Sequence, residues 1–248
     1  MKHATVILNP GLIFFLPKSH NGIVDCWFQG NPSVKHLIES IGVPHTEVGS
    51  ICSNSLDVDF DYLVQDGDAI KVFPYSSFNQ EQITDKLSSN LSIEINPGQF
   101  ILDNHLGRLN AYLRMLGFDC LYNKDWQDDT LAILAWKENR ILLTRDRRLL
   151  MRKIIQKGLC IRSLNPQEQV REVLERYNLY GKFQPFSRCL RCNQKLKPVS
   201  KETVIDQLEP LTRRYFDEFH QCSECGQVYW KGSHYDRMLT LINTLIDH

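Results

Sequence analysis

Three aspartates between residues 100 and 150 have the type and spacing that a divalent-metal site requires. Asp103 ends the apolar run FILD, Asp128 opens the helix-like run DDTLAILA, and Asp146 follows the strand-like residues ILLT. Carboxylates at the ends of buried parallel strands and at a helix start can converge at one edge of a sheet. Hard cations prefer such oxygens and promote phosphodiester hydrolysis. The pattern therefore indicates a Mg²⁺ or Mn²⁺ site at these three residues.

Each aspartate also has an ordinary structural explanation. Asp128, or Asp129 beside it, could be the N-cap of a helix, and Asp103 and Asp146 could be turn residues. Asp129 is also an alternative to Asp128 as the metal ligand. The sequence does not identify a fourth acid, so a second metal position stays open.

A second group of chemically capable residues is formed by two CxxC pairs, with 29 residues between them. Two such pairs suit tetrahedral Zn²⁺, because each forms a tight knuckle and the two knuckles close the coordination sphere. Four thiolates leave no open position, so the predicted site is structural. A redox CxxC would explain one pair but not two. The predicted zinc ligands are Cys189, Cys192, Cys222 and Cys225.

Basic residues accompany the aspartates in the sequence. Arg108 and Arg114 lie on the helix-like run after the first aspartate, and Arg145 and Arg148 flank the third. The planar guanidinium group binds two phosphate oxygens at once, so these arginines are candidate contacts to a nucleic-acid backbone. They could equally be charges on solvated helix faces.

An aromatic and basic cluster follows the second CxxC pair. The cluster consists of Tyr229, Trp230, Lys231 and His234 and could stack on bases. The alternative is that the two aromatic rings pack the ribbon against the rest of the protein.

The charge of the 248-residue chain is unevenly distributed although its net value is zero. Residues 1–80 carry a net charge of −4 and residues 81–248 a net charge of +4, with basic runs at 145–162 and 182–201. A polyanionic partner such as RNA for the C-terminal part is therefore plausible. The sequence shows neither a signal peptide nor an apolar stretch long enough to cross a membrane. We therefore expect a cytoplasmic protein whose cysteines are reduced.

The first 75 residues predict strands around one helix. Residues 4–9 predict a strand, and the apolar residues 12–17 could pair back on it. Ser33 is a candidate N-cap for a helix over residues 34–41. This order, with the ending DGDAIKVFP, resembles the β-grasp (ubiquitin-like) fold and its sulfur-carrier branch. The Gly-Gly that carrier chemistry needs is absent at the end of this segment, so we expect a docking or scaffold module that could bind a protein partner.

Residues 93–180 alternate strand-like and helix-like runs, which predicts a parallel sheet covered by helices. The runs FILDNHLGRLNAYLRMLGFD, DDTLAILA and RILLTRDRRLL resemble the PIN-like nucleases. More closely they resemble the Mut-seven C-terminal RNase family, whose prokaryotic members often carry a ubiquitin-like N-terminal domain. The resemblance implies that Asp103, Asp128 and Asp146 bind Mg²⁺ or Mn²⁺.

The combined prediction is an α/β protein with three parts and a linker. Residues 1–76 form the β-grasp domain, 77–92 the linker, 93–182 the PIN-like nuclease domain, and 183–248 the zinc ribbon with a C-terminal helix. We expect a ribonuclease that leaves 5′-phosphate and 3′-hydroxyl ends. The alternative is a non-catalytic RNA-binding adaptor in which the β-grasp domain docks a protein.

Overall fold

The computed structural model describes residues 1–18, 21–75 and 98–246. The chain forms two compact units, and each contains separate parts of the sequence. The first unit comprises Met1–Asn96, Trp126–Arg162 and Arg176–Asn178. The second comprises Pro97–Asp125, Ser163–Glu175 and Leu179–His248. The predicted linker at 77–92 lies outside the described residues, and the predicted domain boundaries stay predictions.

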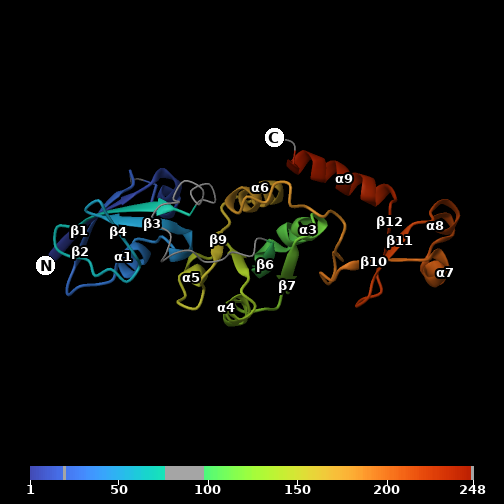
Figure 1. Cartoon of the computed structure of the whole chain (residues 1–248), viewed down its shortest axis with the longest axis horizontal. Coiled ribbons are helices and arrows are strands. Elements are labelled where there is room, and N and C mark those ends of the chain that lie inside the picture. Colours follow the sequence, from blue (N-terminus) through green and yellow to red (C-terminus); the bar gives the residue numbers. More distant parts are fainter. Residues whose placement is uncertain (19–20, 76–97, 247–248) are drawn as a thin grey trace. The chain divides into compact units, whose positions relative to one another are not determined.

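A five-stranded mixed sheet forms the N-terminal part of the first unit (Figure 1). Its order is β2-β1-β5-β3-β4, with β1 antiparallel to β2 and parallel to β5. Every second residue of β1 is buried, so one face of the sheet builds the core. The strands are β1 (Lys2–Leu8), β2 (Ile23–Phe28), β3 (Val48–Ser53), β4 (Leu56–Val58) and β5 (Ala69–Pro74).

The helix α1 (Val34–Ser40) forms as its sequence predicts. The hydroxyl of Ser33 accepts the N–H of His36 at 3.3 Å, which satisfies one of the donors left free at a helix start. Val34, Leu37 and Ile38 are buried at helical spacing. The cap and the apolar face together determine where the helix begins and which side packs inward.

The predicted strand over residues 12–17 is wrong. Pro10–Phe15 form the 3-10 helix η1, and β2 is the strand that pairs back on β1. Proline presets the backbone angle of a helix start, and the side chain of Asn9 accepts the N–H of Gly11 at 3.2 Å. These local contacts favour a helical turn over the extended chain that the apolar run suggested.

The first unit also contains half of the α/β part of the chain. Helix α4 (Asp128–Lys137) precedes β8 (Ile141–Thr144), and helix α5 (Arg147–Leu150) follows it. Strand β9 (Gly158–Cys160) pairs with β8 in parallel. The helix-like run RRLLMRKIIQKG (147–158) is helical only in its first turn, because α5 ends at Leu150.

The second unit begins with the other strands of this α/β part. Strand β6 (Gln99–Leu102) pairs in parallel with β7 (Asp119–Tyr122), and α3 (Gly107–Met115) connects them. The four-stranded sheet has the order β7-β6-β8-β9. Helix α6 (Pro166–Arg176) follows β9 in the sequence. The predicted parallel sheet with helices is confirmed.

The C-terminal part of the second unit is built on a small antiparallel sheet. Its order is β10-β11-β12, with a core of Val204, Leu208, Phe219 and Val228. None of the helices in the described part of the chain has the length and hydropathy to cross a membrane. The elements are β10 (Leu196–Val199), α7 (Lys201–Val204), η4 (Ile205–Gln207), α8 (Pro210–Tyr215), β11 (Phe219–Cys222), β12 (Val228–Trp230) and α9 (Ser233–Ile246).

Candidate functional site

Asp146 lies in the turn that follows the buried strand β8. Its backbone N–H donates to the hydroxyl of Thr144 at 2.9 Å, and its Oδ1 accepts the N–H of Arg148 at 2.7 Å and that of Leu149 at 3.4 Å. Asp146 is thus the N-cap of α5, and its side chain is exposed. The carboxylate is held in place through one oxygen at the carboxyl end of the strand, as its sequence position predicts.

Asp128 and Asp129 occupy the first turn of α4. The N-cap is Gln127, and no side chain makes a capping hydrogen bond there, so the N-cap role considered for either aspartate is wrong. Both carboxylates face Arg152 instead. Asp128 Oδ2 lies 3.7 Å from the guanidinium group, and Asp129 accepts a hydrogen bond from it. Two exposed acids at the positive end of a helix are therefore paired with one half-buried arginine.

Asp103 comes directly after β6 in the second unit. It precedes the 3-10 helix η3 (Asn104–Leu106), and its carbonyl accepts the N–H of Leu106 at 3.0 Å. The residue is 7% exposed, in contrast to the exposed Asp128 and Asp146. Arg108, one turn further along, is exposed on α3.

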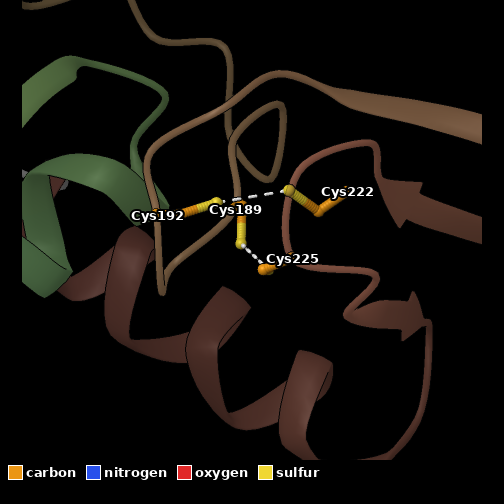
Figure 2. A group of neighbouring side chains, drawn as sticks. All are labelled: Cys189, Cys192, Cys222 and Cys225. Carbon is orange, nitrogen blue, oxygen red and sulfur yellow. Dashed lines mark hydrogen bonds between the residues drawn. The ribbon is translucent and has the colours of Figure 1, made fainter.

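In the described part of the chain, one group of three or more potential metal ligands has its donor atoms within 4.8 Å of one another. This group consists of Cys189, Cys192, Cys222 and Cys225 (Figure 2). The three aspartates are not such a group, so their convergence on a metal stays a prediction.

The four sulfur atoms have the spacing of a tetrahedral thiolate site. Sγ of Cys189 lies 3.5 Å from Sγ of Cys225, and Sγ of Cys192 lies 3.3 Å from Sγ of Cys222. A metal–sulfur distance of about 2.3 Å places tetrahedral sulfur atoms about 3.8 Å apart. Small adjustments would therefore admit an ion, and the four cysteines could bind a metal such as zinc.

Both CxxC loops have the same backbone construction. In the first, the N–H of Asn193 donates to the carbonyl of Cys189 at 2.9 Å, and in the second that of Gly226 donates to the carbonyl of Cys222 at 3.0 Å. Asn193 and Gly226, each directly after the second cysteine, have φ values of 72° and 69°. Asn and Gly are the residues that tolerate this left-handed conformation best. The residue after each pair is therefore part of the knuckle.

Hydrogen bonds prepare Cys189 as a ligand. The hydroxyl of Tyr229 lies 3.2 Å from Sγ of Cys189 and accepts the N–H of Leu190 at 3.1 Å. Burial alone would raise the pKa of the Cys189 thiol. The hydroxyl and nearby backbone N–H groups outweigh burial and lower this pKa to about 6. The pKa of Tyr229 is raised, chiefly by burial, so its hydroxyl stays protonated and can donate a hydrogen bond to the sulfur.

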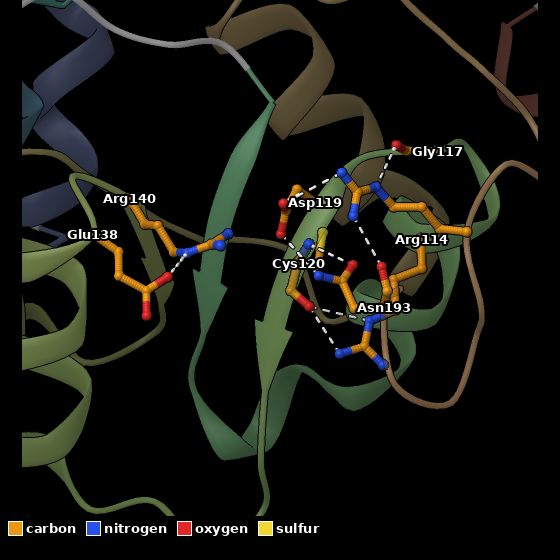
Figure 3. Close-up of polar contacts among 8 residues, drawn as sticks. Arg114, Gly117, Asp119, Cys120, Glu138, Arg140 and Asn193 are labelled. Atoms are coloured by element: carbon orange, nitrogen blue, oxygen red, sulfur yellow. Dashed lines mark hydrogen bonds and ion pairs between the residues drawn. The ribbon is translucent and has the colours of Figure 1, made fainter. Parts of the chain in front are cut away.

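Arg114 does not belong to an exposed phosphate-binding surface. It is 4% exposed, and its guanidinium group donates to the carbonyls of Cys120, Leu190 and Arg191 at 2.8 to 3.1 Å. The contact with Cys120 joins α3 to β7 (Figure 3), and the contacts with Leu190 and Arg191 join α3 to the first knuckle. The placement gives Arg114 a structural role, and the sequence did not reveal it because two of the three carbonyls, those of Leu190 and Arg191, lie 76 and 77 residues away.

Asn193 makes a second connection between the knuckle and β7. Its Oδ1 accepts the N–H of Cys120 at 2.9 Å, and its Nδ2 donates to Asp119 at 2.8 Å (Figure 3). Arg188 adds an ion pair with Asp119 at 3.3 Å and a hydrogen bond to the carbonyl of Gly117 at 3.2 Å. The cysteine site and the strand β7 therefore form one hydrogen-bonded structure.

The other predicted contact residues lie at the surface. Arg145 and Arg148 are exposed on either side of Asp146. Trp230 is 37% exposed, and Lys231 pairs with Glu218 at 2.7 Å. The hydroxyl of Tyr229 hydrogen bonds to Cys189 and Leu190 in the first knuckle. This placement favours the packing alternative for the ring over base stacking.

Comparison with protein families identifies the two parts of the chain. The model of the Mut7-C RNAse domain matches residues 98–242, which is more than half of the chain. The chain belongs to the Mut7-C RNAse family. The Mut7-C ubiquitin model matches residues 1–80, which contain the five-stranded sheet. Searches of curated proteins and of solved structures gave no match.

The Mut7-C RNAse match supports a nuclease-type function and RNA as the substrate class. The matched range contains the three aspartates and all four cysteines. The ubiquitin-like domain, in turn, suggests a protein interaction. The resemblance that the sequence motifs indicated, including the layout of the two domains, is confirmed.

Proposed function

We propose that this Mut7-C RNAse protein hydrolyses RNA phosphodiester bonds with the help of Mg²⁺ or Mn²⁺. The observation that carries the proposal is the placement of Asp146, an exposed carboxylate held at the carboxyl end of a buried strand. In the sequence Asp103 directly follows the strand β6, and Asp128 begins α4. Ligands in α/β sheets bind at the carboxyl ends of the strands.

The chain's residues would divide the work as follows. Asp103, Asp128 and Asp146 would hold the cation, with Asp129 as the alternative to Asp128. Bound Mg²⁺ or Mn²⁺ would supply charge neutralisation and an activated water, so the products would carry 5′-phosphate and 3′-hydroxyl ends. Exposed Arg108, Arg145 and Arg148 would bind the RNA backbone.

Asp128 can serve as a ligand only if its present partner gives way. Arg152 neutralises both acids at the start of α4, and such an exposed ion pair contributes about 1 kcal/mol or less. A divalent cation competes readily for carboxylates held this weakly. We propose that Arg152 turns from Asp128 towards RNA phosphate when the metal binds.

For the four cysteines we propose Zn²⁺ in a structural role. Four thiolates complete a tetrahedral shell and leave no position for water or substrate. The described cysteines form no disulfide, which suits a reducing compartment such as the cytoplasm.

The function is tested by incubating the purified protein with a mixed pool of RNAs, with Mn²⁺ or with EDTA. We expect Asp146→Asn to reduce cleavage about 1000-fold, because a lost metal ligand removes several kcal/mol of transition-state stabilisation. Unfolding midpoints of the variant and the wild type should agree, because asparagine can still cap α5. Tight RNA binding without hydrolysis by the wild type would contradict the proposal and identify an RNA-binding adaptor.

Tyr229→Phe is expected to weaken zinc binding about 10-fold while the fold is retained. The substitution removes the hydroxyl that hydrogen bonds to Cys189, and such supporting contacts contribute 10- to 100-fold to metal affinity. Competition with a chromophoric chelator measures the affinity. Tyr215→Phe is the matched control, since Tyr215 is 65% exposed, whereas the hydroxyl of Tyr229 hydrogen bonds to Cys189. Equal affinities for both variants would contradict the role of the hydroxyl.

A further inference from the structure

The ubiquitin-like part of the chain packs directly against part of the nuclease segment. Residues 126–162 and the N-terminal domain belong to the same compact unit. The 3-10 helix η2 (His45–Glu47) of the N-terminal domain packs against β9. Strand β9 is an edge strand of the four-stranded parallel sheet. An edge strand presents unpaired backbone groups, and a covering segment satisfies them.

Glu47 is the centre of this contact. It is fully buried, and its Oε1 accepts the N–H of Cys160 at 2.7 Å. Its Oε2 lies 3.7 Å from the guanidinium groups of both Arg162 and Arg176. Nearby, Nε2 of His45 donates to the carbonyl of Ile155 at 2.7 Å. The N-terminal domain thus supplies a carboxylate and an imidazole to the edge of the nuclease sheet.

A second contact reaches the residue next to Asp146. The guanidinium group of Arg147 donates to the carbonyls of Phe15 at 2.8 Å and Phe14 at 3.3 Å, and it lies 5.1 Å from the centre of each ring. Arg162 lies over the same two rings, at 5.1 and 5.4 Å. The end of η1 is therefore held between two arginines from the nuclease segment.

From these contacts we infer that Arg147 is a positioning residue, through which the N-terminal domain fixes the Asp146 turn in the geometry that a metal ligand requires. The inference rests on the proposed function of Asp146. Helix α5 is one turn long, and so short a helix has almost no stability of its own. Its first residue is anchored on the N-terminal domain, and the preceding residue is the proposed ligand.

Two variants of Arg147 and one control separate positioning from charge. Arg147→Met removes both hydrogen bonds and the cation over the rings, whereas Arg147→Lys keeps the charge. Lys153→Met removes one positive charge from an exposed site nearby. Phe14→Ala tests the contact from the N-terminal side, where this ring is 45% exposed.

The first measurement is hydrogen exchange of the Arg148 and Leu149 amides in metal-free protein, which reports how firmly Asp146 holds its turn. We expect exchange to be about 10-fold faster in Arg147→Met, intermediate in Arg147→Lys and Phe14→Ala, and unchanged in Lys153→Met. The second measurement is the Mn²⁺ concentration that gives half-maximal RNA cleavage. It should rise about 10-fold in Arg147→Met at an unchanged KM for RNA.

Three outcomes decide the matter. The positioning role would be overturned if Arg147→Met had the same amide exchange rates and the same half-maximal Mn²⁺ concentration as the wild type. That outcome would leave the nuclease proposal intact. Equal acceleration of exchange at Val6 and Ile70, deep in the N-terminal sheet, would also overturn the positioning role, because Arg147 would then act on general stability. A wild-type protein that cleaves no RNA would overturn the proposed function, and exchange would still decide whether Arg147 holds the turn.

Discussion

Removal of zinc from the four-cysteine site is expected to unfold the C-terminal part of the second unit and to abolish RNA cleavage. A structural zinc contributes on the order of 10 kcal/mol to the folding of a small domain. The three-stranded sheet has a core of only a few side chains, so its own burial cannot replace that contribution. The loss should spread to the nuclease strand β7, because Arg114 and Asn193 join it to the first knuckle.

This dependence gives an unusual pattern of metal rescue. After a chelator has stripped the protein, Mn²⁺ alone should fail to restore cleavage, whereas Zn²⁺ followed by Mn²⁺ should restore it. Circular dichroism measures the accompanying loss and recovery of structure. Cys189→Ser should mimic the stripped protein, and Cys52→Ser, at a thiol outside the site, should not. Full cleavage by zinc-free protein with Mn²⁺ alone would contradict the structural coupling.

Glu47→Ala is expected to lower the free energy of unfolding of the first unit by about 3–5 kcal/mol. Removal of one partner from a buried ion pair leaves the remaining charges uncompensated, and Glu47 faces two arginines. The amide of Cys160 also loses its acceptor. Urea denaturation measures the effect. Glu47→Gln should cost less, because the amide oxygen can still accept from Cys160.

The matched control for this prediction is Glu168→Ala. Glu168 pairs with Arg171 on an exposed part of α6, and a pair at this spacing contributes about 0.5 kcal/mol. A similar small effect of Glu47→Ala would mean that the N-terminal domain is only loosely attached. That result would weaken the basis for the positioning role of Arg147.

Local signals in the sequence were sufficient for several elements. Ser33 and the spacing of Val34, Leu37 and Ile38 predict α1, because a cap and an apolar face act within one turn. The two CxxC pairs predict the four-cysteine group for a similar reason, since each knuckle is built within six residues. The residue after each pair, Asn193 or Gly226, was an additional signal for the knuckle turn.

Other features depend on partners that are distant in the sequence. The apolar residues of η1 suggested a strand, but Phe14 and Phe15 contact Arg147 and Arg162, more than 130 residues away. Arg114 looked like a surface charge because its acceptors lie up to 77 residues away. Periodicity reports burial along one element and carries no information about which distant segment provides the contact.

The interleaving of the two units has a consequence for biosynthesis. The first unit includes residues Arg176–Asn178, so its last part leaves the ribosome after the first two segments of the second unit. The strands of the N-terminal sheet are synthesised first, so this sheet can fold early. Glu47 then lacks its arginine partners until Arg162 and Arg176 have been synthesised. A nascent chain stalled before residue 162 would therefore leave the Glu47 carboxylate without either of its arginine partners.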